Sequence, residues 1–331
     1  MRGGLPVVAA LLAVVAPAAV APDPGMERGR AVTQALYAGD AEALKRALSP
    51  EFLAALGGGQ GLRAFISQVA AQLGRETGVQ EELVYQEDGF TNYYRRSRFE
   101  KVPDVTIRWL IGPDGIVHGG LVQPTPTPAA SSHLDYQTKA PLRLPFRAPK
   151  EGRWYVAWGG RDPIRNYHVI AADQRFANDF YVMKDGSPFR GDGKRNEDHY
   201  CFGEPIYAPA GGTVVRGVND VPDNAAPGVT NSAQPVGNYV VIDHGGGEYS
   251  LLAHFRLGSV AVKAGQKVER GTLLGRCGNS GHSDLPHLHY HLQTGPDFQQ
   301  GVGLPAFFNA YRADGQVVAR GEPQRGQYLE P

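Results

Sequence analysis

The chain has 331 residues, of which 42% are hydrophobic and 20% charged, and its 33 basic residues balance 33 acidic ones. This composition is ordinary for a globular protein with a sizeable core and more than one domain. Because the formal net charge is zero, nothing in the composition points to nucleic acid or to an electrostatically bound membrane surface as a partner.

The first residues have the pattern of an export signal. Arg2 precedes an apolar stretch from Leu5 to Val15, and small residues follow. The stretch is short for a spanning helix, so we predict a signal peptide over residues 1–21 in place of an uncleaved anchor, with cleavage after Ala18 in preference to Ala21. The protein is therefore expected to be exported to the periplasm, the cell envelope or the medium, without stable membrane insertion after cleavage.

Residues 25–123 are expected to form a small accessory domain of α+β type. From Met26 to about Leu73, Ala and Leu recur at helical spacing, with Asp40 as a candidate N-cap. From Val79 to Val122 the pattern changes to alternating strands. Helices followed by a curved antiparallel sheet resemble the NTF2-like cone in their order. The sequence does not identify a protein partner for this domain.

A proline-rich segment separates this domain from the rest of the chain. Residues 124–134 begin with Pro124-Thr125-Pro126-Thr127-Pro128, which predicts a stiff, extended linker. Residues 135–331 then carry strand-like segments and Gly/Pro turns with little helical periodicity. This pattern predicts a mainly antiparallel β domain, so the expected fold class is α+β overall.

Two strand-like runs, Asn166 to Ala171 and Phe176 to Met183, are expected to pair as a hairpin. With the turn near Asp173, His168 and Asp179 would lie opposite one another on one face, with Cβ atoms about 5 Å apart. Two such side chains are close enough to share a metal ion. Asp173 is a rival for the carboxylate ligand. We prefer Asp179, because Asp173 would lie in the turn.

A cluster of histidines follows in Pro286-His287-Leu288-His289-Tyr290-His291-Leu292. Side chains alternate faces along a strand, so His287, His289 and His291 would point to one side. Two histidines and a carboxylate leave a fourth tetrahedral position for water, which is typical of catalytic zinc. Such an ion activates water and polarises a carbonyl, so the implied reaction is hydrolysis of an amide or ester.

The proton-transfer groups are expected to be histidines, since the chain has no HExxH motif. His287 shares the face of His289, and His254 lies in the strand-like stretch from Tyr249 to Phe255. An uncoordinated imidazole can accept a proton from water or donate a hydrogen bond to an oxyanion. His291 is expected either to support the ligands from behind or to line the substrate groove, because it would exceed the three-ligand count. The remaining histidines are expected to be structural or exposed: His118, His133, His199, His244 and His282.

The motifs also form an ordered series between about Leu142 and Phe308. After His168 and Asp179 come GEPIYAPAGGTVV from Gly203, GNYVVIDHGGGEYSLLAHF from Gly237, VKAGQKVERGTLLGRCGNSG from Val262 and PHLHYHL from Pro286. The series resembles the LytM or lysostaphin-type zinc metallopeptidases, the M23 family of cell-wall endopeptidases. The sequence departs from the common HxGxD pattern, because His168 and Asp179 are further apart along the chain. The run QRFANDF from Gln174 resembles a branch of the family with a longer hairpin.

The resemblance implies a zinc-dependent endopeptidase that hydrolyses peptide cross-links or stem peptides of bacterial peptidoglycan. It implies that His168, Asp179 and His289 bind Zn²⁺ and that His254 and His287 assist catalysis. The alternative is a non-catalytic LytM-like activator of cell-wall amidases. Activators of this type have typically lost metal-binding or catalytic residues, whereas all five are present here.

Two further alternatives concern other parts of the catalytic segment. Gln266 to Gly275 is similar to the turn of a biotinyl or lipoyl carrier, but Lys267 does not lie at an exposed hairpin tip between hydrophobic strands. Cys201 and Cys277 form either one disulfide or two buried thiols, since an exported protein permits a bridge and sequence alone does not determine it.

Overall fold

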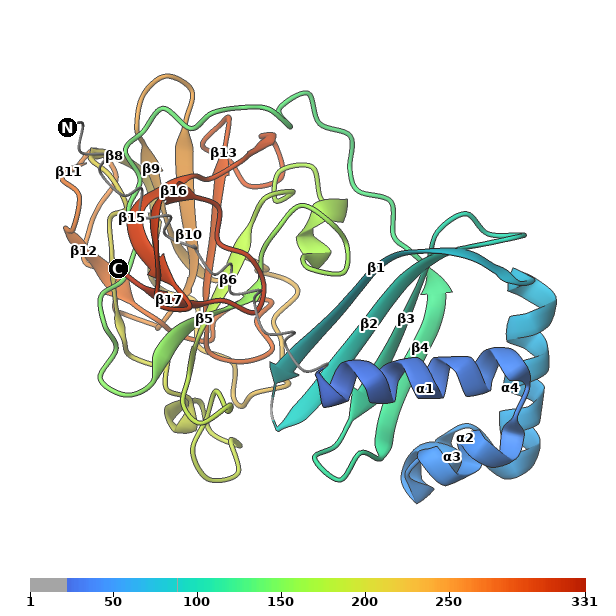
Figure 1. Cartoon of the computed structure of the whole chain (residues 1–331). Coiled ribbons are helices and arrows are strands. Elements are labelled where there is room, and N and C mark those ends of the chain that lie inside the picture. Colours follow the sequence, from blue (N-terminus) through green and yellow to red (C-terminus); the bar gives the residue numbers. More distant parts are fainter. Residues whose placement is uncertain (1–22, 88) are drawn as a thin grey trace, which may run out of the picture.

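The computed structural model describes residues 23–87 and 89–331, so the predicted signal peptide lies outside the described residues. Figure 1 shows two parts, a helix-and-sheet layer at the N-terminal side and a larger β body beside it. Within the described ranges, none of the helices combines the length and the hydropathy of a membrane span. The α+β class predicted from the sequence is confirmed.

The described chain opens with helices. Their bounds are α1 (Pro24–Ala38), α2 (Ala41–Ala47), α3 (Pro50–Ala55) and α4 (Gly58–Leu73). The Asp40 side chain accepts a hydrogen bond from the backbone N–H of Ala43 at 2.9 Å and caps α2, as predicted. Gly57, with φ at +87°, ends the turn between α3 and α4, a conformation that glycine adopts without steric cost.

A four-stranded antiparallel sheet follows the helices. It contains β1 (Glu76–Glu87), β2 (Phe90–Phe99), β3 (Val105–Ile111) and β4 (Val117–Pro124) in sequence order. Alternate β3 residues Val105, Ile107, Trp109 and Ile111 are buried in one core with the helices, which confirms the predicted alternation. The other face of the sheet, which carries Tyr94, is turned toward the β body. The NTF2-like resemblance stays a prediction.

The β body is built around a long antiparallel sheet. Its strand order is β11-β8-β9-β10-β13-β6-β5-β17-β15-β16, with β14 paired to β13. The strands are β5 (Arg153–Trp158), β6 (Asn178–Met183), β8 (Gly212–Val218), β9 (Asn238–Asp243), β10 (Tyr249–Phe255), β11 (Lys267–Val268), β13 (Leu288–Gln293), β14 (Gly303–Leu304), β15 (Phe308–Ala313), β16 (Gln316–Gly321) and β17 (Tyr328–Glu330). A small second sheet pairs β7 (Pro205–Tyr207) with β12 (Leu273–Arg276). Two short 3-10 helices, η1 (Tyr167–Ile170) and η2 (Asn196–Asp198), complete the elements of this part.

The predicted hairpin before β6 is wrong in its first strand. Residues Tyr167–Ile170 form the 3-10 helix η1. The side-chain oxygen of Asn166 accepts from the backbone N–H of His168 at 3.1 Å and closes a tight turn, which competes with strand pairing. Asp179 in β6 is therefore not opposite His168 in a ladder. Its cross-strand partner is His289 in β13.

The proline-rich segment packs against the rest of the molecule. Residues 125–131 contain no helix or strand, but the Ala129 N–H donates to the carbonyl of Val169 at 2.7 Å. The Thr125 and Thr106 hydroxyls lie 2.9 Å apart. The segment is held at both of these points. Its boundaries as a linker, 124–134, stay a prediction.

Cys201 and Cys277 form a disulfide with Cα atoms 5.9 Å apart, which settles the alternative left open by the sequence. The bridge joins residues separated by 76 positions, and such a cross-link typically stabilises a fold by about 2–4 kcal/mol. The next residue, Gly278, donates its N–H to the carbonyl of His254 at 3.0 Å and pairs with His287. The disulfide thus anchors the loop behind both predicted catalytic histidines.

Candidate metal centre

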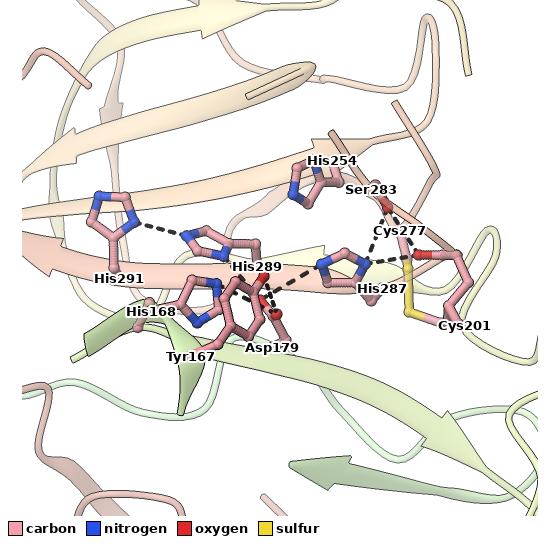
Figure 2. Close-up of polar contacts among 12 residues, drawn as sticks. Tyr167, His168, Asp179, Cys201, His254, Cys277, Ser283, His287, His289 and His291 are labelled. Atoms are coloured by element: carbon pink, nitrogen blue, oxygen red, sulfur yellow. Dashed lines mark hydrogen bonds and ion pairs between the residues drawn. A yellow bond between two sulfur atoms is a disulfide. The ribbon is translucent and has the colours of Figure 1, made fainter. Parts of the chain in front are cut away.

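Three buried side chains converge where η1, β6 and β13 meet (Figure 2). One potential ligand atom from each of His168, Asp179 and His289 lies within 4.8 Å of the others. Asp179 Oδ1 is 2.9 Å from His289 Nδ1, and Oδ2 is 3.5 Å from His168 Nε2. The rival Asp173 lies elsewhere, with its carboxylate accepting from the backbone N–H of Gln299 at 3.0 Å.

The hydrogen bonds of His168 turn one nitrogen lone pair toward Asp179. The amide nitrogen of Asn166 donates to the carbonyls of Gly160 and Ala177, so its Oδ1 must face His168 as an acceptor. His168 Nδ1 lies 2.9 Å from that oxygen and is therefore the protonated nitrogen. Its Nε2 is left with a free lone pair on the side of Asp179, as metal ligation requires.

A second chain of hydrogen bonds sets the tautomer of His289. Gln293 donates its amide N–H to the carbonyl of Gly295 at 2.8 Å, so its Oε1 accepts from His291 Nε2 at 3.1 Å. His291 Nδ1 then accepts from His289 Nε2 at 2.9 Å. His289 Nδ1 is left unprotonated beside Asp179. The supporting position predicted for His291 agrees with this contact, and the predicted common face of His287, His289 and His291 agrees with Figure 2.

His254 reaches the same site because its strand is irregular. β10 has a bulge between Ala253 and Phe255, and His254 has φ at +65°. A bulge bends a strand and redirects one side chain, and a positive φ is costly for a residue other than glycine. His254 Nδ1 donates to the carbonyl of Ser280 at 2.8 Å, which leaves Nε2 available. The ring of His254 lies 4.8 Å from that of His287, centre to centre.

His287 is oriented in the same way. Its Nδ1 lies 2.7 Å from the carbonyl oxygen of Leu285 and 3.1 Å from the Ser283 hydroxyl, while its Nε2 lies 3.6 Å from Asp179 Oδ1. The Nδ1 proton is held by the backbone, so Nε2 is the nitrogen that faces the site. Both predicted catalytic histidines therefore present an Nε2 atom to the group formed by His168, Asp179 and His289.

Burial and mutual contacts shift the pKa values of these groups. Burial lowers the pKa of His168 to about 3, and burial, followed by His287 and His289, lowers the pKa of His254 well below its usual value. For Asp179, burial opposes ionisation, but the charges of His168 and His287 hold its pKa well below the usual range. For His287, burial is likewise outweighed by the Asp179 carboxylate, which raises the pKa. An ionised Asp179 carboxylate beside the neutral imidazole of His168 is a donor set suited to a divalent cation.

Sequence reasoning did not single out Tyr167 or assign His282 to the site. The Tyr167 hydroxyl donates to Asp179 Oδ2 at 3.3 Å, and its ring centre is 3.9 Å from that of His168. Tyr167 and His282 line a pocket of about 270 Å³ that also contains His168, His254 and His289. No sequence signal marks Tyr167 except its position next to His168.

The other histidines have the structural roles expected of them. His244 lies 2.8 Å from both the Gly211 carbonyl and the Ser250 hydroxyl, at a turn after β9. His199 is buried, and its Nε2 lies 3.1 Å from the Gly193 carbonyl. Neither lines the pocket that contains His168 and His289.

One segment of the β body matches a known protein family. Residues 199–300 match the model of peptidase family M23. This part of the chain is thus similar to the M23 peptidases. The matched range includes His254, His287 and His289, whereas His168 and Asp179 precede it.

Curated relatives resemble parts of the chain. Peptidoglycan DD-endopeptidase ShyA of Vibrio cholerae is 39% identical over 91 residues, which cover 28% of this chain and 18% of ShyA. An uncharacterized metalloprotease of Haemophilus influenzae is 39% identical over 88 residues, 27% of this chain and 16% of that protein. Cell division protein DipM of Caulobacter vibrioides is 27% identical over 173 residues, 52% of this chain and 23% of DipM. The chain thus spans about a fifth of the length of these relatives.

Solved structures show more distant likeness. The catalytic domain of lysostaphin from Staphylococcus simulans shares 18% identity at a TM-score of 0.29, covering 46% of this chain and 89% of that domain. The M23 metalloprotease pseudoalterin shares 16% identity at a TM-score of 0.33, covering 57% of this chain and all of that structure, 100%. At such scores the likeness says nothing about function.

Proposed function

We propose that this protein is a zinc-dependent endopeptidase that hydrolyses peptide cross-links or stem peptides of bacterial peptidoglycan. The observation that carries the proposal is the buried group of His168, Asp179 and His289, faced by the Nε2 atoms of His254 and His287. The similarity of residues 199–300 to peptidase family M23 and the peptidoglycan endopeptidase activity of ShyA support the choice of substrate.

The donor set fits zinc. His168 Nε2, one Asp179 oxygen and His289 Nδ1 would hold the ion, because hydrogen bonds to Asn166 and His291 occupy the other nitrogens of the two imidazoles. When bound, zinc supplies Lewis-acid polarisation of a carbonyl and lowers the pKa of water to about 7. In the proposal, Asp173 has no role in binding the metal.

His254 and His287 carry out the proton transfers in this proposal. Their Nδ1 protons are fixed on the carbonyls of Ser280 and Leu285, so each ring exchanges a proton only through Nε2. A neutral Nε2 accepts a proton from the attacking water, and a protonated one donates to the oxyanion or the leaving amine. Tyr167, whose hydroxyl contacts Asp179, helps to hold the carboxylate in place.

The proposal extends to location and domain organisation. Peptidoglycan lies outside the cytoplasmic membrane, so the enzyme would be exported, through the signal peptide predicted at residues 1–21. The domain limits predicted from the sequence, 25–123 and 135–331, are retained as part of the proposal. In it, the N-terminal part contributes to substrate binding.

Digestion of purified sacculi tests the proposed function. Sacculi with direct and with peptide-bridged cross-links would be incubated with the zinc-loaded protein, and released muropeptides identified by mass spectrometry. We expect cleavage of peptide bonds with intact glycan in at least one wall type, and no products with the Asp179→Ala variant. Products that appear only when a cell-wall amidase is added would support the activator in place of the endopeptidase.

A further inference from the structure

The N-terminal sheet and the β body are held together by a buried arginine. The Arg325 guanidinium carbon lies 3.8 Å from the ring centre of Trp158 and 5.1 Å from that of Tyr94. Its Nη1 donates to the Ile164 carbonyl at 3.0 Å and to the Tyr94 hydroxyl at 3.2 Å, and its Nη2 lies 3.4 Å from Glu87. Because Arg325 contacts both parts and is only 4% exposed, the space next to it has fixed walls.

A pocket of about 190 Å³ lies in that space. Its walls come from the sheet face opposite the helices and from the segment that precedes and includes η1. The sheet contributes polar side chains, and the β body contributes aromatic and apolar ones. The sheet residues in these walls include Arg108 and Tyr94. The body contributes Trp158, Ile164, Tyr167 and Ile170.

This interdomain pocket adjoins the pocket of the metal centre. Tyr167 and Ile170 line both pockets, and they are 49% and 57% exposed. The Tyr167 hydroxyl reaches Asp179, while the ring of Tyr167 lies edge-on to Trp158 with centres 5.1 Å apart. An extended ligand that crosses Tyr167 can therefore reach the pocket lined by His168 and His289 and the N-terminal sheet at the same time.

Arg108 lines the interdomain pocket and forms no ion pair with a carboxylate among the described residues. The neighbouring arginines Arg96, Arg165 and Arg325 pair with Asp104, Glu81 and Glu87. Arg108 donates from Nε to Asn92 Oδ1 at 2.9 Å, and from Nη2 to the same oxygen. In residues 23–87 and 89–331, no salt bridge to Arg108 is formed and its Nη1 makes no protein hydrogen bond.

Asn92 and Tyr94 orient this guanidinium. Asn92 is 1% exposed and holds two of the three guanidinium nitrogens, and the Arg108 guanidinium carbon lies 5.5 Å from the centre of the Tyr94 ring. A half-buried, pre-oriented arginine binds carboxylates well, since little side-chain freedom is lost on binding. A neutral amide partner does not compensate its charge.

We propose that the interdomain pocket binds a carboxylate-bearing part of the same peptide whose scissile bond lies at the metal centre, with Arg108 donating hydrogen bonds to that carboxylate. The inference rests on the proposed function, because stem peptides carry free carboxylates at a distance from the bond that is cut. It makes Arg108 a specificity-determining residue, supplied by the N-terminal part to a site whose reacting groups lie in the β body.

Two soluble cross-linked peptides test this assignment, one with free carboxylates and one with the same groups converted to carboxamides. Their dissociation constants for the zinc-free protein are measured by calorimetry, and kcat and KM for the zinc-loaded protein. We expect the wild type to bind the carboxylate peptide about tenfold or more tightly than the amide. Arg108→Gln should lose that preference through a raised KM, with kcat and zinc content unchanged.

Arg98→Gln is the matched control, since Arg98 is exposed on β2, makes no contact with the pocket and carries the same charge. It should keep the preference for the carboxylate peptide. Arg108→Lys keeps the charge but loses the planar fork, so its preference should be intermediate. This second variant serves if circular dichroism shows that Arg108→Gln is misfolded.

The outcomes separate this inference from the proposed function. A wild type that binds both peptides equally, or an Arg108→Gln variant that keeps the preference, overturns the role of the pocket even if both peptides are hydrolysed. A preference that depends on Arg108 without hydrolysis of either peptide supports the pocket and argues against the endopeptidase.

Discussion

Replacing Asp179 by alanine is expected to remove bound zinc and with it all measurable peptide hydrolysis. Asp179 supplies the negative charge of the site and contacts both His168 and His289, so its loss leaves two neutral imidazoles that bind a divalent cation weakly. His289→Ala should have the same effect because it removes one of three ligands. Metal content after dialysis, measured by mass spectrometry, should fall from about one zinc per chain to near zero in both variants.

Asp173→Ala is the matched control for the carboxylate. Asp173 is also buried, but it accepts from the backbone of Gln299 and does not belong to the converging group. This variant should retain its zinc. If Asp173→Ala loses the metal while Asp179→Ala keeps it, the rival ligand is the correct one. Full zinc in His289→Ala would exclude His289 from the ligand set.

Replacing His287 or His254 by alanine is expected to leave zinc bound while slowing turnover. Both present an Nε2 atom to the site without belonging to the proposed ligand set, and loss of a general acid or base typically costs about 10²–10⁴-fold in rate. The measurement is kcat on a soluble cross-link peptide together with zinc content. If both imidazoles serve one proton-transfer step, the double variant should be slowed by less than the product of the single effects.

His291→Ala distinguishes the supporting histidine from the catalytic ones. His291 contacts His289 and Gln293, so at saturating zinc its replacement should leave most of the activity. A His291→Ala variant as slow as His287→Ala under those conditions would contradict the assignment. So would a His287→Ala variant that loses its zinc, because His287 would then be a ligand.

Features that depend on local periodicity were predictable from the sequence. The two-residue repeat of a strand places His287, His289 and His291 on one face, with His287 just before β13 and His289 in contact with His291 within it. The alternation of Val105 and its neighbours in β3 was recognisable for the same reason.

Features that depend on distant or irregular contacts were not. Asn166 forms a hydrogen bond with the chain two residues on, which converts an expected strand into η1. Asp179 contacts His289, which lies 110 residues further along the chain, so no local sequence pattern predicts their contact. The bulge at His254 and the disulfide likewise arise from packing between separate strands and loops.

The contact between the N-terminal sheet and the β body was likewise not predictable from the sequence. Arg325 meets Tyr94 across 231 positions, and neither residue lies in a recognisable motif. A proline-rich segment indicates a spacer between independent units, so sequence reasoning placed the whole site in residues 135–331. Tyr167 and Ile170 instead line both the pocket of the metal centre and the interdomain pocket, so the N-terminal sheet lies within reach of the same substrate in our proposal.

The central claim is that one zinc, held by His168, Asp179 and His289, is needed for peptide hydrolysis. Titration of zinc into metal-free protein tests it most directly, with hydrolysis of a soluble cross-link peptide followed at each addition. We predict that the rate rises in proportion to bound zinc and reaches its plateau at about one ion per chain. Hydrolysis at full rate without metal, or no hydrolysis with the site saturated, would contradict this account.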